Sequence, residues 1–195
     1  MSALFTRLLE LHAIGHARTD LDLHPDFELE GDARDAAVLV AITEREQPGV
    51  LLIHRPSNMR AHPGQIAFPG GKLDSGEGPV EAALREANEE LGIPPGAVRI
   101  VGESDLFRTG SGYAITPVIA MVPPDLELNP NPAEVAQWFE APLHYVFDPA
   151  NHRQVTGDFP LGRRTFWEIT WQDHRIWGVT GALLVNLSRR LAWHG

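Results

Sequence analysis

The sequence predicts an α/β protein, a three-layer α/β/α sandwich around a mixed β-sheet. Short apolar runs bounded by glycine, proline and polar residues recur along the chain, as β-strands should. Apolar residues at helical spacing occur before, between and after these runs. Helices interspersed with strands bury their apolar stripes against the sheet, which favours a layered domain. The 195 residues, 43% of them hydrophobic, suit a sizeable core, so we expect a single domain over residues 1–195.

Residues 1–20 predict an amphipathic helix at the N-terminus. Leu4, Leu8 and Leu11 recur at helical spacing, and the charged residues between them argue against a signal peptide or a membrane span. We expect residues 1–30 to form a helical extension that packs on its own domain. Packing against a second copy in a homodimer is the alternative.

The next elements are strands. Apolar runs at 36–42 and 50–55, separated by a polar turn, predict a hairpin. The remaining strands are expected at 98–107, 114–122 and 134–141, followed by a short helix before Asp148, a late hairpin starting with 165–171, and a last helix from Thr180 to Trp193.

A helix from Pro79 to Leu91 is the best-marked element. Pro79 suits a first helical position, and Gly92 suits a left-handed C-terminal stop. Between them, apolar residues recur at helical spacing, at Val80, Ala83, Leu84, Ala87 and Leu91. This stripe predicts that one face of the helix packs on the sheet.

Three carboxylates converge on another side of this helix. Glu86, Glu89 and Glu90 stand at i, i+3 and i+4, and each like-charge neighbour destabilises a free helix by roughly 0.2–0.5 kcal/mol. A hard divalent cation offsets this cost, because magnesium and manganese prefer carboxylate oxygens together with substrate phosphates. The pattern therefore predicts a site for Mg²⁺ or Mn²⁺.

The loop before the helix fits the same interpretation. Gly70 and Gly71 follow Pro69 and allow a tight turn whose backbone can approach a ligand closely. Glu77 lies near enough along the chain to reach Arg85 or the metal.

Residues 71–93 resemble the Nudix box, G-x5-E-x7-R-E-h-x-E-E-x-G-h with h apolar. Every fixed place is filled, by Gly71, Glu77, Arg85, Glu86, Ala87, Glu89, Glu90, Gly92 and Ile93. The resemblance implies the Nudix fold, a sandwich of the kind expected above, and metal-dependent hydrolysis of a diphosphate linked to another moiety. It also implies Glu86, Glu89 and Glu90 as metal ligands, Arg85 as the residue that orients them and Glu77 as its partner.

Residues 51–71, LLIHRPSNMRAHPGQIAFPGG, resemble the motif of the coenzyme A pyrophosphatase branch, L-L-T-x-R-[SA]-x3-R-x3-G-x3-F-P-G-G. Two places depart from it, Ile53 for threonine and Pro56 for serine or alanine. Tyr113 and the segment 176–184 are also similar to that branch. The resemblance implies substrate-binding roles for Arg55, Arg60, Gly64, Phe68, Gly70 and Gly71. Guanidinium groups bind phosphate in a two-pronged geometry, so Arg55 and Arg60 suit the anionic parts of coenzyme A.

Charge and composition exclude several other classes of function. With 16 basic and 26 acidic residues the formal net charge is -10, which disfavours nucleic acid and gives no attraction to anionic membranes. No cysteine is present, so disulfides and thiolate sites are excluded, and we expect a cytoplasmic protein.

Three functions follow from the sequence. The leading one is hydrolysis of coenzyme A or its derivatives to 4′-phosphopantetheine and adenosine 3′,5′-bisphosphate, with a small molecule as the partner. The second is a Nudix enzyme for ADP-ribose or NADH, and the third is a non-catalytic sensor on the same fold. In the enzymatic readings Glu86 and Glu90 hold the principal metal, and Glu89 completes a multi-metal cluster or acts as the base. Glu134 is a second candidate base, because Nudix enzymes often recruit one from outside the box.

Overall fold

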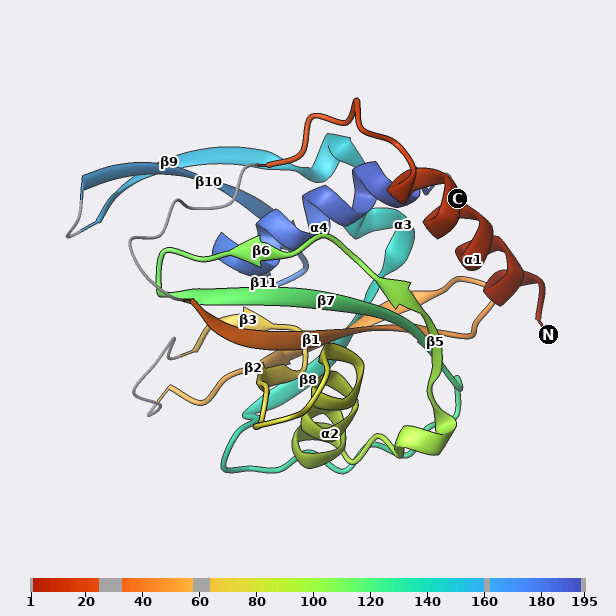
Figure 1. Ribbon diagram of the computed structural model, residues 1–195. Helices are drawn as coiled ribbons and strands as arrows, with labels where there is room; N and C mark the ends of the chain where they lie inside the picture. Colours follow the sequence, from red (N-terminus) through yellow and green to blue (C-terminus); the bar gives the residue numbers. More distant parts are fainter. Residues whose placement is uncertain (1, 25–32, 58–63, 160–161, 194–195) are drawn as a thin grey trace.

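The computed structural model describes residues 2–24, 33–57, 64–159 and 162–193. Two helical layers lie on opposite sides of a mixed sheet, with α2 on one side and α1 and α4 on the other (Figure 1). The three-layer α/β/α sandwich predicted from the sequence is therefore confirmed. The helices are α1 (Ala3–His16), α2 (Pro79–Leu91), α3 (Leu143–Val146) and α4 (Gly178–Leu191).

The strands form two sheets within the described ranges. The main sheet has the path β3-β2-β1-β7-β5, and β4, β6 and β8 pair with β1, β7 and β2. Its strands are β1 (Arg34–Thr43), β2 (Gly49–His54), β3 (Ile66–Ala67), β4 (Gly70–Lys72), β5 (Arg99–Glu103), β6 (Phe107–Arg108), β7 (Tyr113–Val122) and β8 (Gln137–Pro142). β1 and β7 run parallel over their whole length, whereas the other pairs are antiparallel, so the sheet is mixed as predicted.

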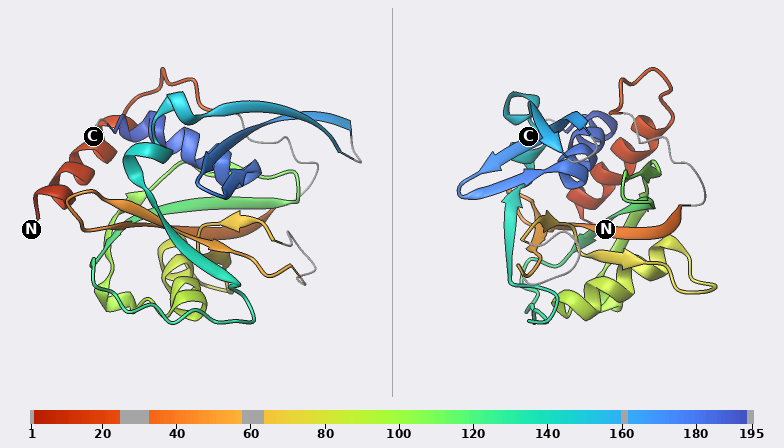
Figure 2. Two further views of the ribbon diagram at one scale, coloured as in Figure 1. Left: turned by 180° about the vertical axis from the view of Figure 1, so that it is seen from behind. Right: turned by 90° about the vertical axis from the view of Figure 1, so that its left-hand side faces the viewer.

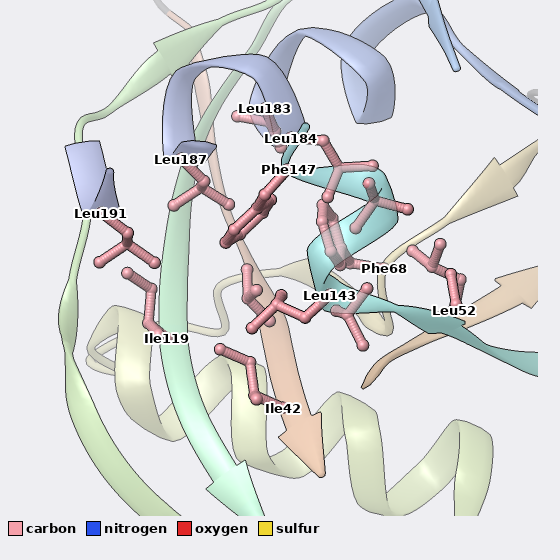
Figure 3. Packing of buried hydrophobic residues seen from close by; sticks show 14 of the residues in the cluster. Ile42, Leu52, Phe68, Ile119, Leu143, Phe147, Leu183, Leu184, Leu187 and Leu191 are labelled. Atoms are coloured by element: carbon pink, nitrogen blue, oxygen red, sulfur yellow. The ribbon is translucent and has the colours of Figure 1, made fainter. Parts of the chain in front are cut away.

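Strand periodicity divides the interior into two cores. Val40 and Ile42 of β1 belong to the core beneath α4, while Leu39 and Ala41 belong to the core that α2 covers. This alternation follows from the two-residue period of a strand that is buried on both faces. Figure 3 shows the first core, in which Leu183, Leu184, Leu187 and Leu191 of α4 pack together with Ile42, Leu52, Ile119 and Leu143.

A smaller sheet extends from the main body. Its strands β9 (Arg153–Phe159), β10 (Gly162–Trp171) and β11 (His174–Trp177) are antiparallel, and α4 follows β11 directly. β10 and β11 contact α4, while the β9–β10 hairpin projects outward (Figure 2). This arrangement brings the start of α4 to one end of the main sheet.

The element boundaries agree in part with the sequence predictions. The helix from Pro79 to Leu91 and the first hairpin are confirmed, and α1 packs on α4 and β5 of its own chain, as expected. The strand predicted at 98–107 is wrong in extent, because a break at residues 104–106 divides it into β5 and β6; β5 itself contains a bulge between Ile100 and Gly102. β8 begins only at Gln137, because residues 132–134 form a turn.

No helix in the described ranges is long and apolar enough to cross a membrane.

Candidate functional site

Helix α2 is held in a fixed orientation by both ends and by its buried face. At its start the backbone N–H of Gly78 donates to the Glu81 side chain, and at its end Gly92 adopts φ 71°, the left-handed conformation that favours glycine. The buried face is packed on the sheet through Ala82, Ala83, Ala87 and Leu91. The carboxylates on the remaining faces therefore have defined positions.

Glu86, Glu90 and Glu134 form an acidic cluster. One carboxylate oxygen from each residue lies within 4.8 Å of the other two. Glu134 comes from the turn before β8, which is docked on α2 because Asn131 N donates to the Glu90 carbonyl at 2.9 Å. The last carbonyls of a helix lack intrahelical partners, so this contact satisfies one of them and brings Glu134 to the cluster.

Burial makes this cluster electrostatically costly in the absence of a cation. Glu90 is only 2% exposed, and burial raises its pKa from 4.5 to about 8, with Glu86 and Glu134 adding to the effect. The hydrogen bond from Gly70 N, at 2.9 Å, and the charge of Arg55 oppose this rise in pKa. Burial likewise raises the pKa of Glu86. A divalent cation would neutralise these charges.

Arg85 ties the neighbouring carboxylates together. Its guanidinium donates to both oxygens of Glu77, at 2.9 and 3.0 Å, and to Glu86 at 2.9 Å and Glu89 at 3.3 Å. A further bond reaches the Lys72 carbonyl at 3.0 Å. The hydrogen bonds with Arg85 lower the pKa of Glu77. Arg85 thus fixes the end of β4 relative to α2 and orients Glu86.

Gly70 and Gly71 leave space that a side chain would fill. A Cβ atom on Gly71 would lie 2.3 Å from Oε1 of Glu86, and one on Gly70 would lie 2.3 Å from the Ala37 carbonyl oxygen. Contacts this short do not occur in folded proteins. Position 70 therefore requires glycine, because the clash is with backbone, whereas a side chain at position 71 would displace the Glu86 carboxylate. The backbone can therefore approach the cluster as closely as the sequence predicted.

A pocket of about 290 Å³ opens beside the cluster. The cluster and Arg55 line it, and Nε of Arg55 is buried with no hydrogen-bond partner among the described residues. A buried unpaired donor is costly, so this guanidinium suits a ligand acceptor at the same end of the pocket. The other lining residues are Ala36, Val38, Gln65, Ile66, Ala67, Phe68, Gly70, Gly71, Lys72, Thr109, Ser111, Tyr113, Ile115, Trp177, Val179, Thr180 and Leu183.

A family model described as NUDIX domain matches residues 33–159, which is more than half of the chain. The chain belongs to the Nudix family. It is 39% identical over 159 residues to a protein named uncharacterized Nudix hydrolase NudL of Enterobacter sp. strain 638, covering 81% of this chain and 83% of that relative. The protein of the same name in Photorhabdus laumondii is 35% identical over 168 residues, with 86% and 90% covered.

Solved Nudix structures share the fold. The Nudix hydrolase RenU of M. smegmatis is similar with a TM-score of 0.50 and 28% identity, covering 58% of this chain and 73% of that one. A MutT/nudix family protein of Enterococcus faecalis aligns over 97% of this chain and 73% of its own, with a TM-score of 0.51 and 14% identity. The solved structures show the shared fold, while the family model and the curated relatives identify the chain as a Nudix hydrolase.

The structure brings most of the predicted Nudix site residues together. Those that line the pocket are Glu86, Glu90, Glu134, Arg55, Phe68, Gly70 and Gly71. Glu77 and Arg85 lie behind the cluster, joined to it through Glu86. Gly64, at φ 68°, donates its N–H to the Arg55 carbonyl. Arg60 lies outside the described residues.

Glu89 is not part of the acidic cluster. Its side chain is 51% exposed and is held by Arg85 on the outer side of α2. Its role as a metal ligand or as the base remains a prediction, whereas Glu134 takes the third place in the cluster. From the sequence, Glu134 is predicted only as a candidate base. Its place in the cluster depends on the docking of its turn on α2, a long-range contact that spacing along the chain does not reveal.

The donors present fit the divalent cation that Nudix hydrolases use. Three converging carboxylates offer hard oxygen ligands, and the charges of Glu86 and Glu134 beside buried Glu90 favour a cation among them.

The sequence did not predict Lys72, Trp177 or Leu183 as pocket residues. The similarity of 176–184 to the coenzyme A branch pointed to the region of Trp177 and Leu183, but not to Lys72.

Proposed function

We propose that this Nudix hydrolase cleaves the diphosphate of coenzyme A or its derivatives, giving 4′-phosphopantetheine and adenosine 3′,5′-bisphosphate. The observation that carries the proposal is the place of Arg55, which lines the pocket beside the acidic cluster and whose buried Nε has no hydrogen-bond partner among the described residues. Arg55 also belongs to the segment that resembles the coenzyme A pyrophosphatase motif. A guanidinium in this place suits an anionic phosphate oxygen.

Glu86, Glu90 and Glu134 would hold Mg²⁺ or Mn²⁺, with Glu89 completing a multi-metal cluster or acting as the base. The cation supplies charge neutralisation on the diphosphate and activation of water. Glu134 is the other candidate for taking the proton of the attacking water, because its carboxylate reaches the pocket directly. Arg85 and Glu77 act as positioning residues, since Arg85 contacts Glu86, Glu77 contacts Arg85, and neither lines the pocket.

Two alternatives share this site. A Nudix enzyme for ADP-ribose or NADH would use the same carboxylates but would not need the residues of the segment 51–71 that match the coenzyme A motif. A non-catalytic sensor on this fold would gain nothing from a buried, costly acidic cluster, so the retained carboxylates favour catalysis. We further propose that the protein acts in the cytoplasm, which its cysteine-free composition suits.

A comparison of substrates tests the proposal. Purified protein is assayed with Mg²⁺ and equal concentrations of coenzyme A, ADP-ribose and NADH, and the products are identified by mass spectrometry. We expect kcat/KM for coenzyme A to exceed that for the other two by at least about tenfold, a difference of about 1.4 kcal/mol, because the segment 51–71 beside the pocket resembles the coenzyme A pyrophosphatase motif.

Equal or faster turnover of ADP-ribose would contradict the coenzyme A proposal and favour the second function. Binding of these compounds without turnover of any of them, in Mg²⁺ or Mn²⁺, would favour the sensor.

Repeating the assay with Arg55→Lys separates charge from geometry, because lysine keeps the charge but loses the two-pronged contact. We expect KM for coenzyme A to rise in this variant.

A further inference from the structure

The pocket has two chemically different walls. Its charged side chains gather at the end formed by α2, β4 and the turn before β8, namely Glu86, Glu90, Glu134, Arg55 and Lys72. The other wall comes from the start of β7, from β11 and from the start of α4. Of the described residues that line this second wall, none carries a charge; they include Ile115, Trp177, Val179 and Leu183. The β11–α4 segment lies across the main sheet from α2 (Figure 1).

The size of the pocket limits what it can enclose. Pockets for drug-sized ligands measure about 300–1,000 Å³, and this one measures about 290 Å³. Coenzyme A consists of two large halves joined at the diphosphate. With the diphosphate at the acidic cluster, the uncharged wall has room for one half of the molecule, and the other half extends outside.

The chemistry of the uncharged wall selects between these halves. The adenosine half carries a 3′-phosphate close to the diphosphate, and moving that charge from water against this wall is costly, because none of the described residues that line it is cationic and the nearby Arg175 already pairs with Glu168. The pantetheine half is neutral and combines methyl groups with amides. Burial of such apolar groups against Val179 and Leu183 is favourable.

Trp177 in this wall is packed between two neighbouring side chains. It is half-buried, and its ring lies 5.3 Å from that of Phe166 and 5.1 Å from the Arg175 guanidinium carbon. A braced aromatic ring provides a large contact area at low entropic cost, which is typical of binding anchors.

We propose that the β11–α4 wall, with Trp177 as its anchor, binds the neutral pantetheine half of the substrate and leaves the adenosine 3′-phosphate half outside the pocket. This inference rests on the proposed function. It assigns the orientation of the substrate and a specificity-determining residue that contacts neither the metal ligands nor the diphosphate.

Product inhibition tests the orientation. Inhibition constants of 4′-phosphopantetheine and of adenosine 3′,5′-bisphosphate are measured separately with Mg²⁺ for the wild type and for Trp177→Ala. We expect inhibition by 4′-phosphopantetheine to weaken about tenfold or more, as truncation of a buried aromatic anchor typically does. Inhibition by adenosine 3′,5′-bisphosphate should change less than about twofold, as for contacts outside an anchor.

Two further variants keep the test independent of folding. Val179→Asp retains the helix, because an acidic residue is favourable in the first turn of α4, yet it places a charge in the apolar wall. It should weaken 4′-phosphopantetheine selectively, like Trp177→Ala. Trp138→Ala is the matched control, because Trp138 on β8 is 39% exposed and does not line the pocket. It should change neither constant.

A selective loss of adenosine 3′,5′-bisphosphate binding, an equal loss for both products, or no change in either would overturn the orientation. The coenzyme A proposal would survive all three, because it depends on turnover by the wild type. Absence of coenzyme A turnover in the wild type overturns the proposed function, and the inference with it.

Discussion

Glu90→Gln is expected to remove nearly all turnover while making the metal-free protein more stable. Glutamine has the same shape and can still accept the hydrogen bond from Gly70 N, but it cannot serve as an anionic metal ligand. Loss of one preorganised electrostatic contact commonly costs 10²–10³-fold in kcat, and we expect about 10³-fold or more here because a ligand of the cation is lost.

The gain in stability has a definite sign. The pKa of Glu90 is raised from 4.5 to about 8 in the folded protein, so folding takes up a proton, and stability falls as the pH rises through that window. Glutamine removes this penalty, which is of the order of 4 kcal/mol at pH 8. The metal-free variant should therefore melt roughly 8–16 °C above the wild type in a chelator at that pH.

Calorimetry at pH 8 in chelator and kinetics in Mg²⁺ check the two halves of this prediction. The control is Glu81→Gln on the same helix, which removes the same charge from an exposed position and keeps a side chain able to cap Gly78. It should leave turnover unchanged. Wild-type-like turnover of the Glu90 variant would refute the assignment of this residue as a ligand.

Arg85→Ala is expected to lower activity and stability together. The substitution removes hydrogen bonds to Glu77, Glu86 and Glu89 and leaves an acidic group without its counter-charge. The Arg85 side chain is 27% exposed, so water replaces part of the loss. Since removing a partner from a partly buried charge-assisted bond costs about 1.5–3 kcal/mol, the melting temperature should fall by roughly 5–10 °C.

Activity should fall through Glu86, which loses the contact that orients it. A displacement of about 1 Å in a catalytic group can cost on the order of 10²-fold in rate. Arg85→Lys should recover stability in part and activity little, because one ammonium cannot bridge three carboxylates. Arg18→Ala is the control, since Arg18 pairs with Asp20 on the exposed surface, where such pairs contribute about 0–1 kcal/mol. Unaltered turnover of Arg85→Ala would remove Arg85 from the account.

Local signals explain why helix α2 could be predicted to the residue. Pro79 and Gly92 act on the backbone at its two ends, and neither needs a distant partner. Strand β9 was missed for the opposite reason. Residues 153–158 of this strand are half-buried or exposed and include Gly157, so they carry little of the apolar alternation that marks a strand, and pairing with β10 decides their conformation.

The candidate site shows the same division. The box residues Glu86 and Glu90 could be placed from spacing on one helix, because three and four residues bring side chains to one side. The position of Glu134 depends on the docking of its turn on the last carbonyls of α2. The β11–α4 wall depends on how distant segments of the chain pack around the sheet. Neither contact has a signal that spacing along the sequence could provide.

The proposed hydrolysis of a diphosphate depends on a divalent cation between Glu86, Glu90 and Glu134. Anomalous diffraction from crystals soaked in Mn²⁺, at the manganese absorption edge, measures this directly. We predict an anomalous difference peak for a manganese ion that is bound by carboxylate oxygens of these three residues. The peak should be absent from crystals treated with a chelator. Crystals with no manganese at the cluster, from a preparation that hydrolyses its substrate in Mn²⁺, would contradict the account.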